Sequence, residues 1–196
     1  MLNQSFTYIK TIAINDLKLI FSDATLRAFL VLPFLLFVMA IWLVPMLLTK
    51  YDFLNAYINL FLIVLIVENT QGFCIINSLL FIEEKETQVA KVYGILPVSK
   101  VRLIFARMFI PYVLTVLFNL ALLCFQSLVN LSIIYSLIIS LLAALIVPIY
   151  VLLLSSFAKN RLEGMVYIKL FNLLVLLPIA AFFIACLLYT SDAADE

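Results

Sequence analysis

Long uninterrupted apolar stretches are the feature that most limits what this chain can fold into. Residues 26–48 hold one basic residue, Arg27, and no acidic residue. A helix needs about 20 apolar residues to cross a bilayer core, and only helices or closed barrels satisfy their backbone hydrogen bonds in lipid. The stretches do not alternate and exceed the roughly 10-residue strands of a membrane barrel. We therefore predict an all-α, polytopic bundle of transmembrane helices.

Five such stretches predict five spans in one transmembrane domain of residues 1–185. The predicted spans are residues 26–48, 53–82, 101–128, 131–157 and 166–185. Composition agrees, because 67% of the 196 residues are hydrophobic and 12% are charged. Soluble domains are about 45–50% apolar and about 25% charged.

The segment before the first span, residues 7–22, mixes apolar and polar side chains. This mixture predicts an amphipathic helix that lies on the membrane surface. A soluble N-terminal helix is the alternative interpretation.

The distribution of basic residues predicts the orientation. With the N-terminus in the cytoplasm, eleven of the twelve basic residues lie inside and only Lys50 lies outside. Because cytoplasmic loops carry the excess of Lys and Arg, we predict a multi-pass plasma-membrane protein with a cytoplasmic N-terminus, and we expect a bacterial source.

The last eleven residues, 186–196, read Cys-Leu-Leu-Tyr-Thr-Ser-Asp-Ala-Ala-Asp-Glu. This string resembles the translation of a transposase adapter used in DNA sequencing libraries. We therefore expect that it is not native. The alternative is a short polar tail.

Several kinds of chemistry lack their residues in the sequence. There is no His, no phosphate-binding loop and no Cys, His or acidic spacing typical of a metal site. No basic patch interleaved with aromatic residues suggests nucleic acid. A carboxylate enzyme would have to use Glu83, Glu84 and Glu86, which have no companion cluster. We predict that the chain is not an enzyme and binds no metal or cofactor itself.

Residues 83–100, between the second and third predicted spans, form the longest charged stretch. An acidic start predicts a helix, Gly94 and Pro97 predict its end, and Ser99 predicts the N-cap of the next helix. An exposed surface helix of this kind can be gripped by another protein. The alternative is a solvated connector.

Polar residues also occur within the second predicted span. They are Glu68, Asn69, Gln71 and Asn77. Ionisable groups inside a membrane are costly and usually face a cavity or a partner. We predict a polar lining of a substrate path or of a dimer interface. The alternative is a shifted helix in which a neutral Glu68 is hydrogen-bonded within the bundle.

The charged stretch carries a recognisable motif. Glu-Glu-Lys-Glu-Thr (83–87), followed by Leu-Pro-Val-Ser-Lys (96–100), resembles the signature of ABC-2 type transporter permeases. Residues 14–23 resemble the surface helix of that family, and residues 157–164 resemble a loop of its fluoroquinolone-export-like branch. Family members usually have six spans, so we expect the sixth span to be missing and the chain to be truncated.

The resemblance implies a permease subunit that dimerises with a second permease protomer in the lipid. It also implies a separate cytoplasmic ATP-binding cassette ATPase, which binds ATP and Mg. The implied coupling residues are Glu83, Glu84, Glu86, Thr87 and Lys91. The cargo would be an amphiphilic small molecule, lipid or peptide. The alternative is a non-transport membrane protein of an immunity or scaffold type, without an ATPase.

Overall fold

The protein was analysed as a computed structural model, which describes residues 2–89, 91, 99–174 and 177. Within these residues every regular element is a helix, so the predicted all-α fold is confirmed. Four helical segments are long and apolar enough to cross a membrane.

The elements follow one another along the chain as helices joined by short turns. α1 spans Leu2–Ser22. The first membrane segment consists of α2 (Ala24–Val38), a π-helical turn η1 (Met39–Leu43) and α3 (Val44–Lys50). The second consists of a 3₁₀ turn η2 (Asp52–Tyr57) and α4 (Ile58–Glu86). The third is α6 (Lys100–Phe125), and the fourth consists of α7 (Ile133–Ala144) and α8 (Ile146–Phe157).

The helices differ from the predicted bounds at functionally important places. α4 extends four residues past the predicted end at Ile82, so the acidic run belongs to α4 and not to a separate surface helix. The last helix begins at Arg161, five residues before the predicted start of the fifth span, and is described as far as 174. The rest of that span, Gly94, Pro97 and residues 186–196 lie outside the described residues.

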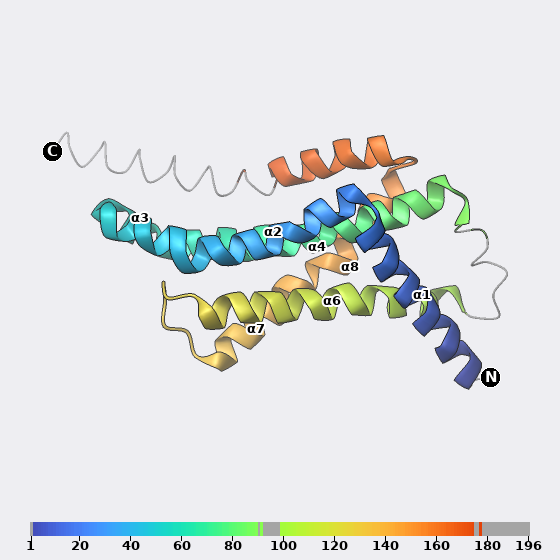
Figure 1. Ribbon diagram of the computed structural model, residues 1–196, viewed down its shortest axis with the longest axis horizontal. Coiled ribbons are helices and arrows are strands. Elements are labelled where there is room, and N and C mark those ends of the chain that lie inside the picture. The colour runs from blue at the N-terminus through green and yellow to red at the C-terminus, as the bar shows by residue number, and fades with distance from the viewer. Residues whose placement is uncertain (1, 90, 92–98, 175–176, 178–196) are drawn as a thin grey trace.

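α4 lies at the centre of the bundle, between α2, α6 and α8 (Figure 1). In its most apolar stretch 56% of the residues are buried, against 22–33% in the other three membrane segments. It is also the least hydrophobic of the four, with a mean hydropathy of 1.7 against 2.2–2.9. A central position keeps its polar side chains away from lipid, where they would be costly.

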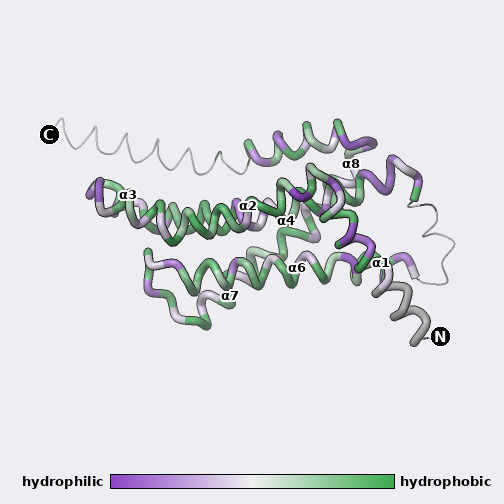
Figure 2. The backbone as a smooth tube through the Cα atoms, in the orientation of Figure 1, coloured by the Kyte–Doolittle hydropathy of each residue, from purple (hydrophilic) through white to green (hydrophobic). Residues whose placement is uncertain are grey.

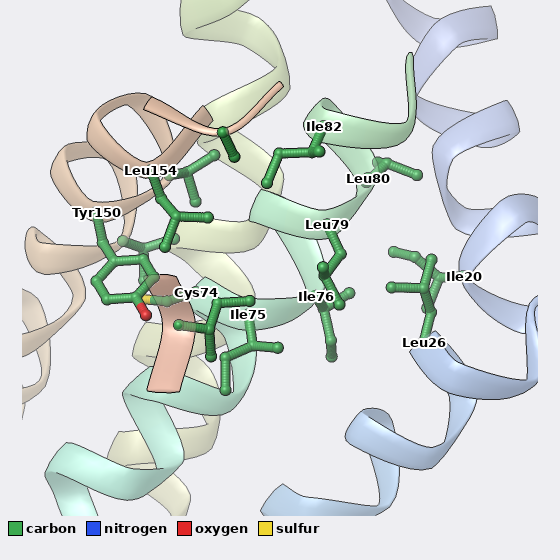
Figure 3. Packing of buried hydrophobic residues seen from close by; sticks show 14 of the residues in the cluster. Ile20, Leu26, Cys74, Ile75, Ile76, Leu79, Leu80, Ile82, Tyr150 and Leu154 are labelled. Atoms are coloured by element: carbon green, nitrogen blue, oxygen red, sulfur yellow. The ribbon is translucent and has the colours of Figure 1, made fainter. Parts of the chain in front are cut away.

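Apolar side chains on opposite faces of α4 join it to its neighbours. Figure 3 shows Leu79 and Ile82 of α4 between Leu154 of α8 on one side and Ile20 of α1 on the other. Gly72 faces Leu32 of α2, where an added Cβ would come within 3.3 Å of the leucine side chain. Small residues let membrane helices approach closely.

The fourth membrane segment is broken between α7 and α8. Pro148 has no backbone N–H to donate to the carbonyl of Ala144, and its ring crowds that turn. The chain tightens there, and Leu145 N donates to Leu142 O at 3.2 Å. The break lets α7 pack against α6 while α8 packs against α4.

Charged residues gather at one end of the bundle, which we call the charged end. α1 crosses the bundle there, α4 ends and α6 begins (Figures 1 and 2). The start of α6 follows the sequence prediction, because the Ser99 side chain accepts a hydrogen bond from Arg102 N at 3.3 Å. The opposite end, around α3, carries Lys50.

Candidate functional site

Arg107 of α6 holds the first of two ion-pair clusters at the charged end. Its guanidinium donates to both oxygens of Glu84, at 2.6 and 2.8 Å, and to both oxygens of Asp16, at 2.8 and 2.9 Å. The side chains of Arg107 and Glu84 are only 4% and 8% exposed. We call Arg107, Glu84 and Asp16 the inner cluster. It joins α6, α4 and α1.

α1 presents Asp16 to the bundle because of its helical spacing. Ile12, Asp16 and Ile20 recur every fourth residue and therefore share one face, and both isoleucines are buried. Burial raises the pKa of the Asp16 carboxyl to about 6, although the nearby Arg107 acts in the opposite direction. Asp16 therefore faces the bundle interior, and α1 does more than rest on a surface.

Arg161 holds the second cluster. Its guanidinium donates to both oxygens of Asp23, at 2.8 and 2.9 Å, and lies 3.5 Å from a carboxylate oxygen of Glu83. Its backbone N–H donates to Glu86 at 2.9 Å. We call Arg161, Asp23, Glu83 and Glu86 the outer cluster, because the Arg161 and Asp23 side chains are each 24% exposed.

Asp23 also caps α2. One of its carboxylate oxygens accepts from Thr25 N at 2.7 Å and from Leu26 N at 2.9 Å. The hydrogen bonds from Arg161 and from the helix start hold the pKa of Asp23 well below its ordinary value. The outer cluster therefore links the start of one membrane helix to the end of another.

Lys85 adds a third connection from the end of α4. Its ammonium donates to the carbonyls of Ser155 and Ala158, at 3.1 and 2.9 Å, and so caps the C-terminal end of α8. Beyond α8, Asn160 accepts from Glu163 N, and Glu163 accepts from Lys159 N, both at 2.9 Å. This reciprocal capping box starts the last helix.

The five predicted coupling residues therefore occupy different environments. Glu84 is buried in the inner cluster, and Glu83 and Glu86 bind the outer cluster. Thr87 and Lys91 are exposed. Between them Gln88 has a left-handed backbone with φ of 61° and accepts a hydrogen bond from Lys91 Nζ at 3.1 Å.

A groove lies between α1 and the end of α4, with a volume of about 500 Å³. Its lining mixes charged, polar and apolar side chains, which include Lys18, Glu83, Thr87 and Val89. Val89 is 40% exposed. The groove is thus bordered by the exposed part of the acidic run.

The polar residues inside α4 do not share one lining. Asn69 is 1% exposed and donates to Asn119 of α6 at 2.6 Å, while Asn119 donates to Thr70 at 2.9 Å. Such bonds hold membrane helices together. Glu68 is half-buried, and Gln71 is buried with its side-chain oxygen lacking a partner among the described residues.

Asn77 alone of the four predicted lining residues borders a cavity. This cavity has a volume of about 270 Å³ and lies between α1, α2, α4 and α6. Asp16 and Arg107 of the inner cluster also border it. Among the described residues no group of three His, Cys, Asp or Glu side chains could hold a metal ion.

A comparison with known protein families matches residues 16–188, to the family described as Fluoroquinolones export permease protein Rv2686c-like. The chain belongs to this family. It is therefore a multi-pass transport permease, as the sequence motifs predict. A comparison with curated proteins and a comparison with solved structures find no match.

The family match covers every residue of the two clusters in this permease, since it begins at Asp16. Sequence reasoning found the acidic run but missed the residues that bind it: Asp16, Asp23, Arg107 and Arg161. A signal existed for two of them. Arg107 stands inside an apolar helix, and Asp16 interrupts a buried face. The pairing of each arginine with two acidic residues required the tertiary structure.

Proposed function

We propose that this chain is the permease subunit of an ABC-2 type exporter driven by a separate ATP-binding cassette ATPase. The ATPase would bind ATP and Mg, and a second permease protomer would complete the transporter in the membrane. The charged end would face the cytosol, as the basic residues predict. Family membership supports a permease, and the connections at the end of α4 support coupling to an external motor.

The observation that carries the proposal is the way the acidic run is anchored. Four consecutive residues, Glu83 to Glu86, bind side chains or backbone of α6, α8 and the last helix, and through two arginines they reach Asp16 and Asp23. A displacement applied to the end of α4 would move these helices together. Packed elements transmit such motion because they have a few discrete arrangements.

The exposed residues beyond this anchor are the proposed contact surface. Thr87, Val89 and Lys91 are exposed beside the groove between α1 and α4. We assign docking of the ATPase to them, whereas Glu83, Glu84 and Glu86 transmit its motion into the bundle. This divides the five implied coupling residues into two roles.

Capture of the ATPase tests the proposal. The permease would be co-expressed with the ATP-binding cassette protein encoded beside it and purified by a tag on the permease. We expect Lys91→Glu combined with Val89→Asp to reduce the captured ATPase about tenfold or more, because the change reverses a charge and buries an acid in the contact. Reversing Glu83, Glu84 and Glu86 would be less informative, because it also breaks both clusters.

The matched control is Lys50→Glu, since Lys50 is an exposed lysine at the opposite end of the bundle. It should leave capture unchanged. Equal capture by wild type and by the Lys91 and Val89 variant would contradict the assigned surface. Absence of capture by the wild type would favour a non-transport membrane protein.

Labelling tests the orientation. Single cysteines at positions 50 and 91, in a chain whose Cys124 and Cys186 are serine, would be treated on intact cells with a membrane-impermeant maleimide. We expect labelling at position 50 and none at position 91 until the cells are opened. Labelling at position 91 from outside would reverse the proposed topology.

Glu68 is the proposed polar contact within the membrane, facing the cargo route or the second protomer. It is half-buried in this single chain. We expect Glu68→Gln to keep ATPase capture and to lower ATP-driven export in reconstituted vesicles. Unchanged export would remove Glu68 from the route.

A further inference from the structure

The cavity beside the inner cluster has the size and the lining of a site for a small molecule. Its volume is about 270 Å³, close to the lower limit of ligand pockets, which is about 300 Å³. Most of its lining is apolar and comes from four helices, α1, α2, α4 and α6. Polar groups border it only at Asp16, Arg107 and Asn77 within the described lining.

The aromatic part of the lining is pre-arranged. Phe34 and Phe118 meet edge-to-face with ring centroids 5.4 Å apart, and Phe73 lies 5.3 Å from Phe118. Rings in such offset and edge contacts offer both faces and edges to another flat ring. Aromatic rings also keep their shape, since they have few rotatable bonds. This part of the cavity therefore suits an apolar ring better than a flexible chain.

The polar part of the cavity presents an acceptor. Arg107 directs four hydrogen bonds at Glu84 and Asp16, and its side chain is 4% exposed. Asp16 is 15% exposed. Each Asp16 oxygen accepts one bond from Arg107 and, as a carboxylate oxygen, has a second lone pair. A group bound at this point would therefore donate hydrogen bonds to a carboxylate.

We propose that the cavity binds an amphiphilic amine, with its ammonium group at Asp16 and its apolar ring among Phe34, Phe73 and Phe118. A phospholipid chain could fill the apolar walls, but its phosphate would be repelled by the carboxylates of Asp16 and Glu84. Binding at this cavity goes beyond the proposed function and does not require it. Only the role of such an amine as cargo rests on the proposed function.

A pair of probes of equal shape tests the proposal. 2-(1-Naphthyl)ethylamine carries the ammonium group, and 2-(1-naphthyl)ethanol replaces it with a neutral hydroxyl. Binding of each to the full chain in phosphatidylcholine nanodiscs would be measured by naphthalene fluorescence, with empty nanodiscs subtracted. We expect the amine to bind about tenfold or more tightly than the alcohol, as a charge-assisted hydrogen bond predicts.

Three variants locate the binding. Asp16→Asn should remove the preference for the amine, while Asp23→Asn, which changes the other N-terminal aspartate of an arginine pair, should keep it. Leu114→Trp fills the cavity without touching the inner cluster and should abolish binding of both probes. Because Leu114→Trp leaves the ion pairs intact, it remains informative if Asp16→Asn fails to fold.

Two results would overturn the proposal. Equal binding of amine and alcohol to the wild type would make the cavity an apolar site, for example for a lipid chain. Binding of the amine that survives Leu114→Trp would place it elsewhere. Neither measurement includes the ATPase, so failure here and failure of the proposed function are separate outcomes.

Discussion

The inner and outer clusters place the same chemistry in two different surroundings. In each, one arginine bridges an aspartate of the N-terminal segment to a glutamate of the acidic run. The inner arginine is 4% exposed, and the outer one is 24% exposed. The distances differ as well, since Arg107 lies 2.6 Å from Glu84 and Arg161 lies 3.5 Å from Glu83.

Helix geometry explains how neighbouring glutamates join different clusters. Consecutive residues of a helix point about 100° apart, because one turn takes about 3.6 residues. Glu84 therefore faces α6, while Glu83 and Glu86, three residues apart, share the side that faces Arg161. The comparison teaches that burial sets the cost of losing each pair. A buried charge without its partner is strongly destabilising, whereas solvent screens an exposed one.

Removing each arginine gives the largest expected effect and the most direct test of the comparison. Arg107→Gln should lower the free energy of unfolding by about 3–5 kcal/mol, because two buried carboxylates lose their guanidinium. Arg161→Gln should lower it by about 1 kcal/mol. Thermal unfolding in detergent, followed by circular dichroism, measures both. Equal losses would mean that burial does not distinguish the clusters.

The close helix approach beside the outer cluster gives the next effect. A Cβ added to Gly164 would lie 2.7 Å from Cδ1 of Ile82, a fully buried side chain of α4. Gly164→Ala should therefore cost about 1–3 kcal/mol, the usual range for overpacking, and should loosen the helix that carries Arg161.

Shortening the opposing side chain is the control for this effect. Ile82→Val removes Cδ1, so the double variant Gly164→Ala with Ile82→Val should recover much of the stability. A double-mutant cycle measures this coupling. Strictly additive losses would argue against direct packing of Gly164 on Ile82.

The two aspartates should respond to pH in opposite directions. The pKa of folded Asp16 is about 6, above its ordinary 3.8, so its contribution to stability is complete below about pH 4 and is lost as pH rises through 6. The pKa of Asp23 is lowered, so its contribution is present above the ordinary value and is lost as pH falls.

Unfolding between about pH 5 and about pH 7.5 separates the two groups. Over this interval Asp16 should reduce the stability of the wild type by about 1 kcal/mol. Asp16→Asn should remove this dependence, and Asp23→Asn should retain it. A dependence that persists in Asp16→Asn would assign the titration to another group.

The smallest expected effect concerns the residue where the acidic run turns. Gln88 has φ of 61°, a conformation that costs an ordinary residue about 1–2 kcal/mol. Gln88→Gly should relieve this cost but should increase the entropy of the unfolded chain, for a net gain of about 0.5 kcal/mol. The same unfolding assay applies, and a clear loss would show that the Gln88 side chain itself stabilises the turn. Neither cluster contains Gln88, so the difference between Arg107→Gln and Arg161→Gln should persist in this background.

The polar groups of α4 show why the sequence could only partly predict the candidate site. Glu68, Asn69, Gln71 and Asn77 stand out in an apolar span, but their spacing does not reveal their neighbours. Asn69 binds Asn119, fifty residues further along the chain, and only Asn77 reaches the cavity. A contact between distant residues depends on how the helices rotate and cross, and a single sequence does not specify this.

Composition and patterning alone determined that this protein is a bundle of membrane helices with an acidic run at the end of the central one. These properties follow from the sequence because lipid accepts only satisfied backbones and apolar surfaces. Only the tertiary structure decided that Glu84 turns inward to Arg107 and that Glu83 and Glu86 turn towards Arg161. The reason is that ion pairs require charges from different helices to meet within a few ångströms, and packing alone brings them there.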